Sequence, residues 1–228
     1  MKNAIIICSG GLDSVVSAHY AKKKLNYDNL IILFFNYNQK PLLSERNCAK
    51  KCSKELKAKF LEIKLPELAK LSSSLINNKG KYKTLSIKNL KDTKEESRKF
   101  YVPFRNGLFV SYALALADSL FIKEKKKFDI FLGFKCEGNN PFPDTTEEFV
   151  SNVNKLTMAT KSKPKIIAPL IDLDKEDIVN LAVKLGVNMN DTHSCYINNK
   201  HCGQCLACAL RKAGFYWANQ ADTTSYLN

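Results

Sequence analysis

Long apolar runs are missing from this sequence, and so is a secretion signal of the usual form. No run of hydrophobic residues approaches the ~20 that an α-helix needs to cross a bilayer. The short apolar run at residues 4–8 is followed by Ser-Gly-Gly, where a signal peptide would carry its cleavage site. We therefore expect a cytoplasmic protein that does not enter a membrane.

Two common nucleotide-binding fingerprints are also missing. The sequence has neither the dinucleotide-binding pattern G-x-G-x-x-G nor the phosphate-binding pattern G-x-x-x-x-G-K-[ST]. It also shows no internal repeat. Any phosphate-binding loop in this chain is therefore of another kind.

Acidic residues are scarce relative to basic ones. The 228 residues include 36 Lys and Arg but 22 Asp and Glu, which gives a formal net charge of +14. Such a charge attracts polyanions, but most of it is scattered lysine, and the lysine runs fall near the ends of expected elements. We interpret it as solvated surface, with a nucleic-acid partner as the weaker alternative. A bound polyphosphate would also use part of this positive field.

Alternating strands and helices are what the sequence does contain. Short β-type runs recur at residues 4–8, 30–35, 60–65, 129–134 and 166–169. The helical patterns are one from about residue 14, those over 44–58, 106–122 and 147–160, and a last one capped by Asp174 and ended by Gly186. Strands that alternate with such helices form βαβ units. We therefore expect an α/β fold, with a parallel five-stranded sheet covered by helices on both faces.

The length of the chain suits one substantial domain with a small appendage. We place the α/β domain at residues 1–192 and a small cysteine-rich unit, packed on it, at residues 193–228. Within the first, residues 72–99 are polar, rich in lysine and weakly periodic. We expect an insertion or a mobile flap there.

The stretch "SGGLDS" at residues 9–14 marks the end of the first expected strand. In a parallel sheet, ligands collect beyond the carboxyl ends of the strands. Gly10 and Gly11 let backbone N–H groups face outward in a tight turn. Ser9 and Ser14 add hydroxyl groups, and the N-terminus of the next helix adds partial positive charge. We interpret the stretch as a nest for a phosphate or pyrophosphate rather than as an ordinary turn with an Asp or Ser cap.

Cysteine is concentrated near the C-terminal end. Four of the eight cysteines lie in "CYINNKHCGQCLAC", and these are Cys195, Cys202, Cys205 and Cys208. Without a secretion signal, such a cluster favours metal over disulfides, and four thiolates close the tetrahedral shell of a structural Zn²⁺. Two alternatives stay open, namely His193 or His201 in place of one sulfur, or free thiols without metal. The remaining cysteines are expected in the core, and these are Cys8, Cys48, Cys52 and Cys136.

The stretch "IIICSGGLDS" resembles the PP-loop of the ATP pyrophosphatases, enzymes that transfer AMP to a substrate and release pyrophosphate. The resemblance implies a Rossmann-like fold of the adenine-nucleotide α-hydrolase type, with ATP and Mg²⁺ as cofactors. The residues that it assigns to the ATP pyrophosphate are Ser9, Gly10, Gly11, Leu12, Asp13 and Ser14. It also assigns Mg²⁺ to Asp13. The segment "FFNYNQ" at 34–39 matches the position that holds adenine, which adds Asn36 and Gln39 to the ATP site.

Further segments along nearly the whole chain resemble one branch of this superfamily, the QueC family of queuosine biosynthesis. They are "YVPFRN" at 101–106, "PFPDTTEEFV" at 141–150, "APLIDLDKEDI" at 168–178 and "CGQCLACALRKAGF" at 202–215. The resemblance implies a ligase that uses ATP to convert 7-carboxy-7-deazaguanine and ammonia into 7-cyano-7-deazaguanine through adenylated intermediates. It also implies a homodimer.

The same resemblance points to residues that bind the substrate. Arg105 is the first choice for a carboxylate or phosphate, because a guanidinium binds either through two parallel hydrogen bonds. With Ser9 and Asp13 it forms the expected catalytic set. The alternative for Arg105 and Asn106 is solvent exposure at the start of a helix. For a flat heterocycle the candidates are Asn106 and Asp144 as hydrogen-bonding groups and Phe100, Tyr101 or Phe142 as stacking groups.

The sequence departs from the family pattern around the expected substrate pocket. The departures are Asn36, Asn38, Phe104, Gly138, Thr145 and Thr146. Gly138 and Thr146 replace an acid and a base, whereas the ATP nest is unchanged, so adenylation follows more directly from the sequence than the acceptor does. Two alternatives stay open. One is a QueC-like paralogue that uses another acceptor or stops at the amide, and the other is a PP-loop enzyme that modifies tRNA.

Overall fold

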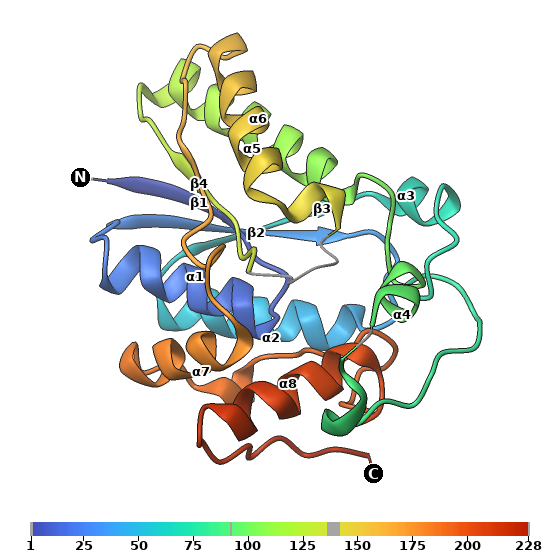
Figure 1. Ribbon diagram of the computed structural model, residues 1–228. Coiled ribbons are helices and arrows are strands. Elements are labelled where there is room, and N and C mark those ends of the chain that lie inside the picture. Colours follow the sequence, from blue (N-terminus) through green and yellow to red (C-terminus); the bar gives the residue numbers. More distant parts are fainter. Residues whose placement is uncertain (1, 92, 136–141, 228) are drawn as a thin grey trace.

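The computed structural model describes residues 2–91, 93–135 and 142–227, and at its centre lies a parallel five-stranded sheet (Figure 1). The strands are β1 (Asn3–Ile7), β2 (Asn29–Asn36), β3 (Lys59–Lys64), β4 (Asp129–Phe131) and β5 (Ile166–Ile167). They lie in the order β3-β2-β1-β4-β5, and every neighbouring pair is parallel. The predicted parallel sheet is confirmed. Its strand order reverses at β1, which pairs with β2 on one side and with β4 on the other.

Helices cover both faces of the sheet, as predicted. They are α1 (Leu12–Lys23), α2 (Leu42–Glu55), α3 (Pro66–Lys70), α4 (Lys94–Arg98), α5 (Arg105–Glu124), α6 (Glu147–Leu156), α7 (Lys175–Lys184) and α8 (Leu206–Trp217). Figure 1 shows α5 and α6 on one side and α1, α2, α7 and α8 on the other. Alternate side chains of β1 serve the two faces, because Ile6 packs with α1 and α7 whereas Ile5 packs with α5. None of the described helices is both long and apolar enough to span a membrane.

Helix ends follow the predicted signals in most places. Asp174 forms a capping box with Asp177 at the start of α7, and Gly186 follows its end with a φ of +62°. Helix α6 continues as a 3-10 turn (Thr157–Ala159), close to the predicted 147–160. Helix α8 has no predicted counterpart, because the cysteines around its start dominate the pattern there.

Two strands are shorter than predicted, and the reason is physical in each case. Strand β4 ends at Phe131 rather than at 134, and Gly133 then passes so close to α1 that a Cβ there would lie 2.6 Å from the Ser14 Cα. Strand β5 ends at Ile167 rather than at 169, since Pro169 has no N–H to donate.

The described part of the segment, residues 72–91 and 93–99, contacts both the sheet core and the cysteine-rich tail. Leu75, Ile76 and Leu85 are buried in the core that also holds α5. The Leu85 N–H donates to the carbonyl of Gln204 at 2.9 Å, which joins this segment to the tail. The segment is thus packed on the core at residues 75, 76 and 85, and its mobility stays a prediction.

Candidate active site and metal centre

A cavity of about 230 Å³ opens at the carboxyl edge of β1, β2 and β4. This edge is the place where strand order reverses, which is where open α/β sheets bind ligands. The residues of the SGGLDS stretch that line the cavity are Ser9, Gly11, Leu12, Asp13 and Ser14. The other walls come from the start of α5, the start of α7 and the tail. The structure therefore brings the N-terminal motif and the C-terminal unit to one cavity.

The diglycine turn is held by hydrogen bonds on its protein side. Gly10 has a φ of +79°, in the left-handed region that favours glycine, and its carbonyl accepts from the His193 N–H at 2.8 Å. The Ser9 hydroxyl accepts from the Gly11 N–H at 3.3 Å, and the Ser14 hydroxyl donates to the Gly11 carbonyl at 2.9 Å. Helix α1 then begins at Leu12. The N–H groups of a first helical turn have no intrahelical acceptor, so this end of α1 suits an anion.

Asp13 is paired with Lys175, which lies in the family segment at 168–178 but to which the sequence analysis assigns no role. The Lys175 ammonium lies 2.6 Å and 2.7 Å from the two carboxylate oxygens of Asp13, and both side chains line the cavity. Lys175 is the first residue of α7 and directly follows its Asp174 cap. This place at the start of a helix is the feature of the sequence that could have pointed to it. A carboxylate with neighbouring phosphate oxygens is the donor set that Mg²⁺ uses in nucleotide sites, so Asp13 fits a Mg²⁺ ligand.

Arg105 faces the cavity at the start of α5. Its Nη1 donates to the Tyr37 hydroxyl at 3.0 Å, and its guanidinium lies 5.9 Å from the centre of the Phe109 ring. Its Nε is buried and has no hydrogen-bond partner among the described residues. A guanidinium with a buried, unused donor is suited to a planar anion such as a carboxylate.

The other predicted substrate residues are placed unequally around the cavity. Asn106 and Phe142 line it, and the Phe142 ring stacks on Tyr101 with centroids 5.4 Å apart. Asp144 is buried, and its carboxylate accepts from the Asn106 N–H at 3.0 Å. Asp144 thus anchors the start of α5, and its contact with a substrate stays a prediction.

The two residues assigned to adenine also differ. Gln39 lines the cavity and donates to the Glu45 carboxylate at 2.9 Å. Asn36 instead donates to Glu62 at 3.3 Å and is absent from the described lining of the cavity. The structure therefore brings Gln39, and not the Asn36 side chain, to the site.

The four tail cysteines converge as a metal site requires. The sulfur atoms of Cys195, Cys202, Cys205 and Cys208 all lie within 4.8 Å of one another, and all four side chains are buried. Two of the sulfur pairs are 3.9 Å apart, close to the about 3.8 Å that Zn–S bonds of about 2.3 Å give in a tetrahedron. Hydrogen bonds among the thiols lower the pKa of Cys202 and raise the pKa of Cys205 and Cys208, so the four sulfurs titrate as one coupled group.

The two histidines considered as ligands make other contacts. His193 Nε2 pairs with the Asn198 carbonyl at 2.8 Å, and His201 Nε2 accepts from the Ser194 N–H at 3.1 Å. The cluster therefore consists of cysteines alone. Four thiolates fit a closed, structural Zn²⁺ site.

Comparison with known proteins decides the family. A family model described as "Queuosine biosynthesis protein QueC" matches residues 3–219. The chain belongs to the QueC family. It is 36% identical to the 7-cyano-7-deazaguanine synthase of Pyrococcus horikoshii, with 100% of this chain and 98% of that relative covered. The 7-cyano-7-deazaguanine synthase of a Nitratiruptor species is 37% identical, with 98% of each chain covered. The solved structure of NMN synthetase from Francisella tularensis is 17% identical, with a TM-score of 0.48 over 97% of this chain and 79% of its own.

The structure locates most of the residues at which this chain departs from the QueC pattern. Phe104 adopts a φ of +51° and is 59% exposed, Thr145 lines the cavity, and the Thr146 hydroxyl caps α6 by accepting from the Phe149 N–H. Gly138 lies outside the described residues. Thr145 is therefore the departure for which a direct effect on the acceptor pocket is expected.

Glu45 is a cavity residue of this QueC protein that the sequence motifs do not mark. Glu45 lies on α2 and lines the cavity, and burial of its carboxyl group raises the pKa of that group to about 7. Glu45 follows the expected adenine residue Gln39 by six residues, a spacing that does not mark it as a site residue. The carboxyl group is therefore partly neutral near neutral pH, unlike an exposed glutamate.

Replacing Glu45 with glutamine is expected to stabilise the protein in a pH-dependent way. The folded-state pKa is raised, so the stability contributed by Glu45 is complete below its unfolded pKa of 4.5 and is lost as pH rises through about 7. E45Q should therefore have a free energy of unfolding higher than that of the wild type by about 3 kcal/mol at pH 8.5 and equal to it at pH 4.

Thermal unfolding at the two pH values measures this difference. The control variant is E55Q, which removes a carboxylate that lies at the end of the same helix and is 43% exposed. A gain for E45Q that does not change with pH would contradict the assignment.

Proposed function

We propose that this chain is a 7-cyano-7-deazaguanine synthase, which converts 7-carboxy-7-deazaguanine and ammonia into the nitrile at the expense of ATP. The observation that carries the proposal is the meeting of an anion-binding diglycine turn, the Asp13–Lys175 pair and Arg105 in one cavity. The names of relatives above 30% identity over the full length support the same activity.

The chemistry explains why such a site uses ATP. A carboxylate resists attack by ammonia, because its oxygen is a poor leaving group. In the first step, a carboxylate oxygen of the acceptor attacks the α-phosphorus of ATP. Pyrophosphate leaves, and an acyl-adenylate forms. Ammonia then attacks the carbonyl carbon, loses a proton, and AMP carries the oxygen away. A second adenylation, now on the amide oxygen, lets AMP leave again as the C≡N bond forms and the nitrogen loses its protons.

The protein's part in these steps is to position the reactants and to neutralise charge. The N–H groups at the start of α1 face the departing pyrophosphate, and Lys175 neutralises charge that develops on it. Arg105 orients the carboxylate of the acceptor toward the α-phosphorus. Mg²⁺ supplies further charge neutralisation when it is bound, and Asp13 is the ligand that would hold it. Zn²⁺ at the four tail cysteines is assigned a structural role.

Product analysis tests the proposal directly. Purified protein is supplied with ATP, Mg²⁺, ammonium and 7-carboxy-7-deazaguanine, and the products are identified by mass spectrometry. We expect the nitrile together with pyrophosphate and two AMP per nitrile. One AMP per product and an accumulating amide would instead favour the paralogue that stops early, which the Thr145 departure makes the second candidate. No AMP with any deazaguanine, but AMP with tRNA, would overturn both.

Lys175→Met is expected to impair ATP use strongly. Removal of a preorganised cation from a developing phosphate charge costs about 100-fold or more in rate. We therefore expect kcat/KM for ATP to fall by about 100-fold, as measured by pyrophosphate release. Lys184, exposed at the other end of α7, supplies the control variant K184M, which should keep wild-type kinetics. Equal kinetics for K175M and the wild type would exclude a contribution of Lys175 to ATP turnover.

The organisation of the chain is proposed on the same basis. We propose that residues 1–192 form the nucleotide-binding domain and that residues 193–228 form a zinc unit packed on it, since the four clustered cysteines all lie in the second range. A cytoplasmic homodimer completes the proposal. Sedimentation of the purified protein tests the dimer.

A further inference from the structure

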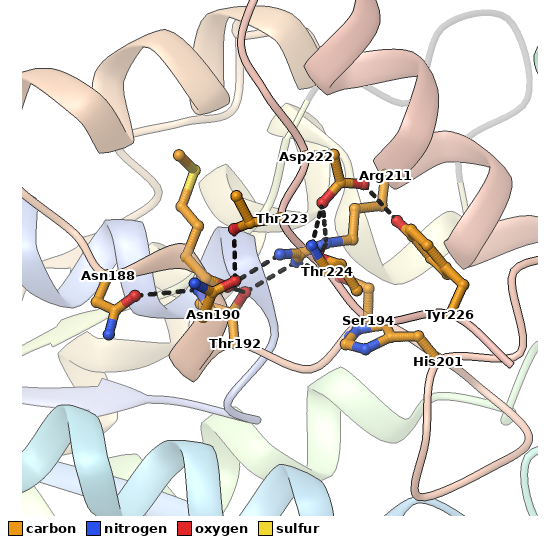
Figure 2. Close-up of polar contacts among 11 residues, drawn as sticks. Asn188, Asn190, Thr192, Ser194, His201, Arg211, Asp222, Thr223, Thr224 and Tyr226 are labelled. Atoms are coloured by element: carbon orange, nitrogen blue, oxygen red, sulfur yellow. Dashed lines mark hydrogen bonds and ion pairs between the residues drawn. The ribbon is translucent and has the colours of Figure 1, made fainter.

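Arg211 is a buried arginine at the centre of a hydrogen-bond network in the tail (Figure 2). It lies on α8 and is 1% exposed. Its donors reach four acceptors: Nε to Thr224 Oγ1 (3.0 Å), Nη1 to Thr192 Oγ1 (2.8 Å) and Ser194 Oγ (3.2 Å), and Nη2 to the Met189 carbonyl (2.9 Å). The guanidinium thus joins α8 to two segments, the chain at 189–194 and the chain end at 222–226.

Stability alone gives a weak reason for a cation at this position. The nearest carboxylate oxygen, on Asp222, is 3.9 Å from Nε, and Asp222 also accepts from the Tyr226 hydroxyl at 2.5 Å. A buried ion pair costs desolvation energy that its own attraction often fails to offset, so an apolar side chain of similar volume serves stability as well. The forked geometry of a guanidinium does something that an apolar side chain cannot, because it fixes several acceptors relative to one another.

The acceptors on the 189–194 segment lie on both sides of His193. Thr192 and Ser194 are its two neighbours, and both hydroxyls accept from Nη1 of Arg211. The backbone N–H of His193 donates to the Gly10 carbonyl at 2.8 Å. A Cβ built on Gly11 would lie 3.5 Å from the His193 carbonyl, so the His193 backbone rests against both glycines.

We propose that Arg211 is a positioning residue for ATP binding, which acts by holding His193 so that its N–H fixes the Gly10 peptide. Gly10 has a φ of +79°, a conformation from which a glycine peptide turns easily, and the direction of the next N–H groups depends on it. With the carbonyl of Gly10 tied to the tail, the turn presents its N–H groups to the cavity before the nucleotide arrives. The proposal rests on the assignment of this turn to ATP.

Arg211→Met tests the proposal in the full chain. We expect the dissociation constant of Mg·ATP, measured by calorimetry, to rise by at least tenfold, and amide hydrogen exchange of residues 9–14 to speed up. Zinc content should be unchanged. Arg211→Lys should be intermediate, because an ammonium provides charge without the fork. For Arg211→Ala, which leaves a cavity, we expect added guanidinium at millimolar concentration to restore part of the ATP affinity.

Lys212→Met is the matched control on the same helix. The Lys212 ammonium donates to the Gly203 carbonyl at 3.0 Å and lies 4.2 Å from the Tyr226 ring centre, so it supports the zinc loop and the chain end but not the 189–194 segment. K212M should lower the unfolding temperature without a change in ATP affinity or in exchange of residues 9–14.

The outcomes separate this proposal from the proposed function. Loss of stability in R211M with wild-type ATP affinity and unchanged exchange at 9–14 would overturn the positioning role. Equal losses of ATP affinity in R211M and K212M would also overturn it. If the wild type itself does not bind ATP, the proposed function fails, whereas exchange of residues 9–14 still decides whether Arg211 holds the turn.

Discussion

Gly10→Ala is expected to abolish release of pyrophosphate, with a loss of at least about 1,000-fold. The alanine Cβ would collide with the Glu45 carbonyl and would lie 2.9 Å from both the Ala49 N and the Cys48 Cβ. These neighbours are the backbone and first side-chain atom of α2, which cannot move aside as a flexible side-chain end can. The Gly10 φ of +79° adds strain of about 1 kcal/mol. The turn should therefore be pushed into the cavity, where its N–H groups no longer converge on a phosphate.

Gly186→Ala is the matched control for backbone strain. Gly186 has a similar φ of +62°, but the nearest atom to its new Cβ would be the Lys23 Nζ at 3.9 Å. G186A should therefore lose about 1 kcal/mol of stability and keep full activity. Pyrophosphate release and thermal unfolding distinguish the two variants. Substantial activity in G10A would mean that the turn does not need the conformation seen here.

Cys205→Ser is expected to release zinc and to unfold the tail. A structural Zn²⁺ contributes on the order of 10 kcal/mol to the segment that it holds. Cys205 directly precedes α8, whose Leu206 and Ala209 are buried in the core with α5. Without the metal, α8 should detach, and Arg211 and His193 should lose their positions. We therefore expect loss of ATP binding as well as of zinc.

Elemental analysis, ATP calorimetry and thermal unfolding measure these effects, and Co²⁺ substitution reports the thiolate set by its visible absorption. The control is Cys48→Ser, since Cys48 is a half-buried thiol of α2 outside the cluster. C48S should retain zinc. Zinc content in C205S equal to that of the wild type would exclude Cys205 as a ligand.

The sequence predicts the parts of this protein that depend on local pattern. The five strands, the Asp174 cap and the convergence of the four cysteines follow from periodicity, capping chemistry and ligand spacing. The position of the diglycine turn follows from two glycines at a strand end, because a turn there that exposes backbone N–H groups favours glycine.

The residues that sequence reasoning missed depend on long-range contacts. Lys175 matters because α7 begins beside Asp13, although the two residues are far apart in the chain. Glu45 is unusual because of its burial, which no short motif encodes. Arg211 lies within a recognised segment, yet its acceptors come from residues on either side of the four-cysteine cluster. Such roles appear only when the topology is known.

The tie between Gly10 and His193 has a consequence for synthesis of the protein. A ribosome synthesises the turn around Gly10 before His193, with β4 and α7 in between. Contacts so distant along the chain form late, after slower closure of the intervening loop. A nascent polypeptide that ends before His193 therefore contains the turn but lacks the hydrogen bond that fixes the Gly10 peptide. Products terminated before His193 should be unable to consume ATP.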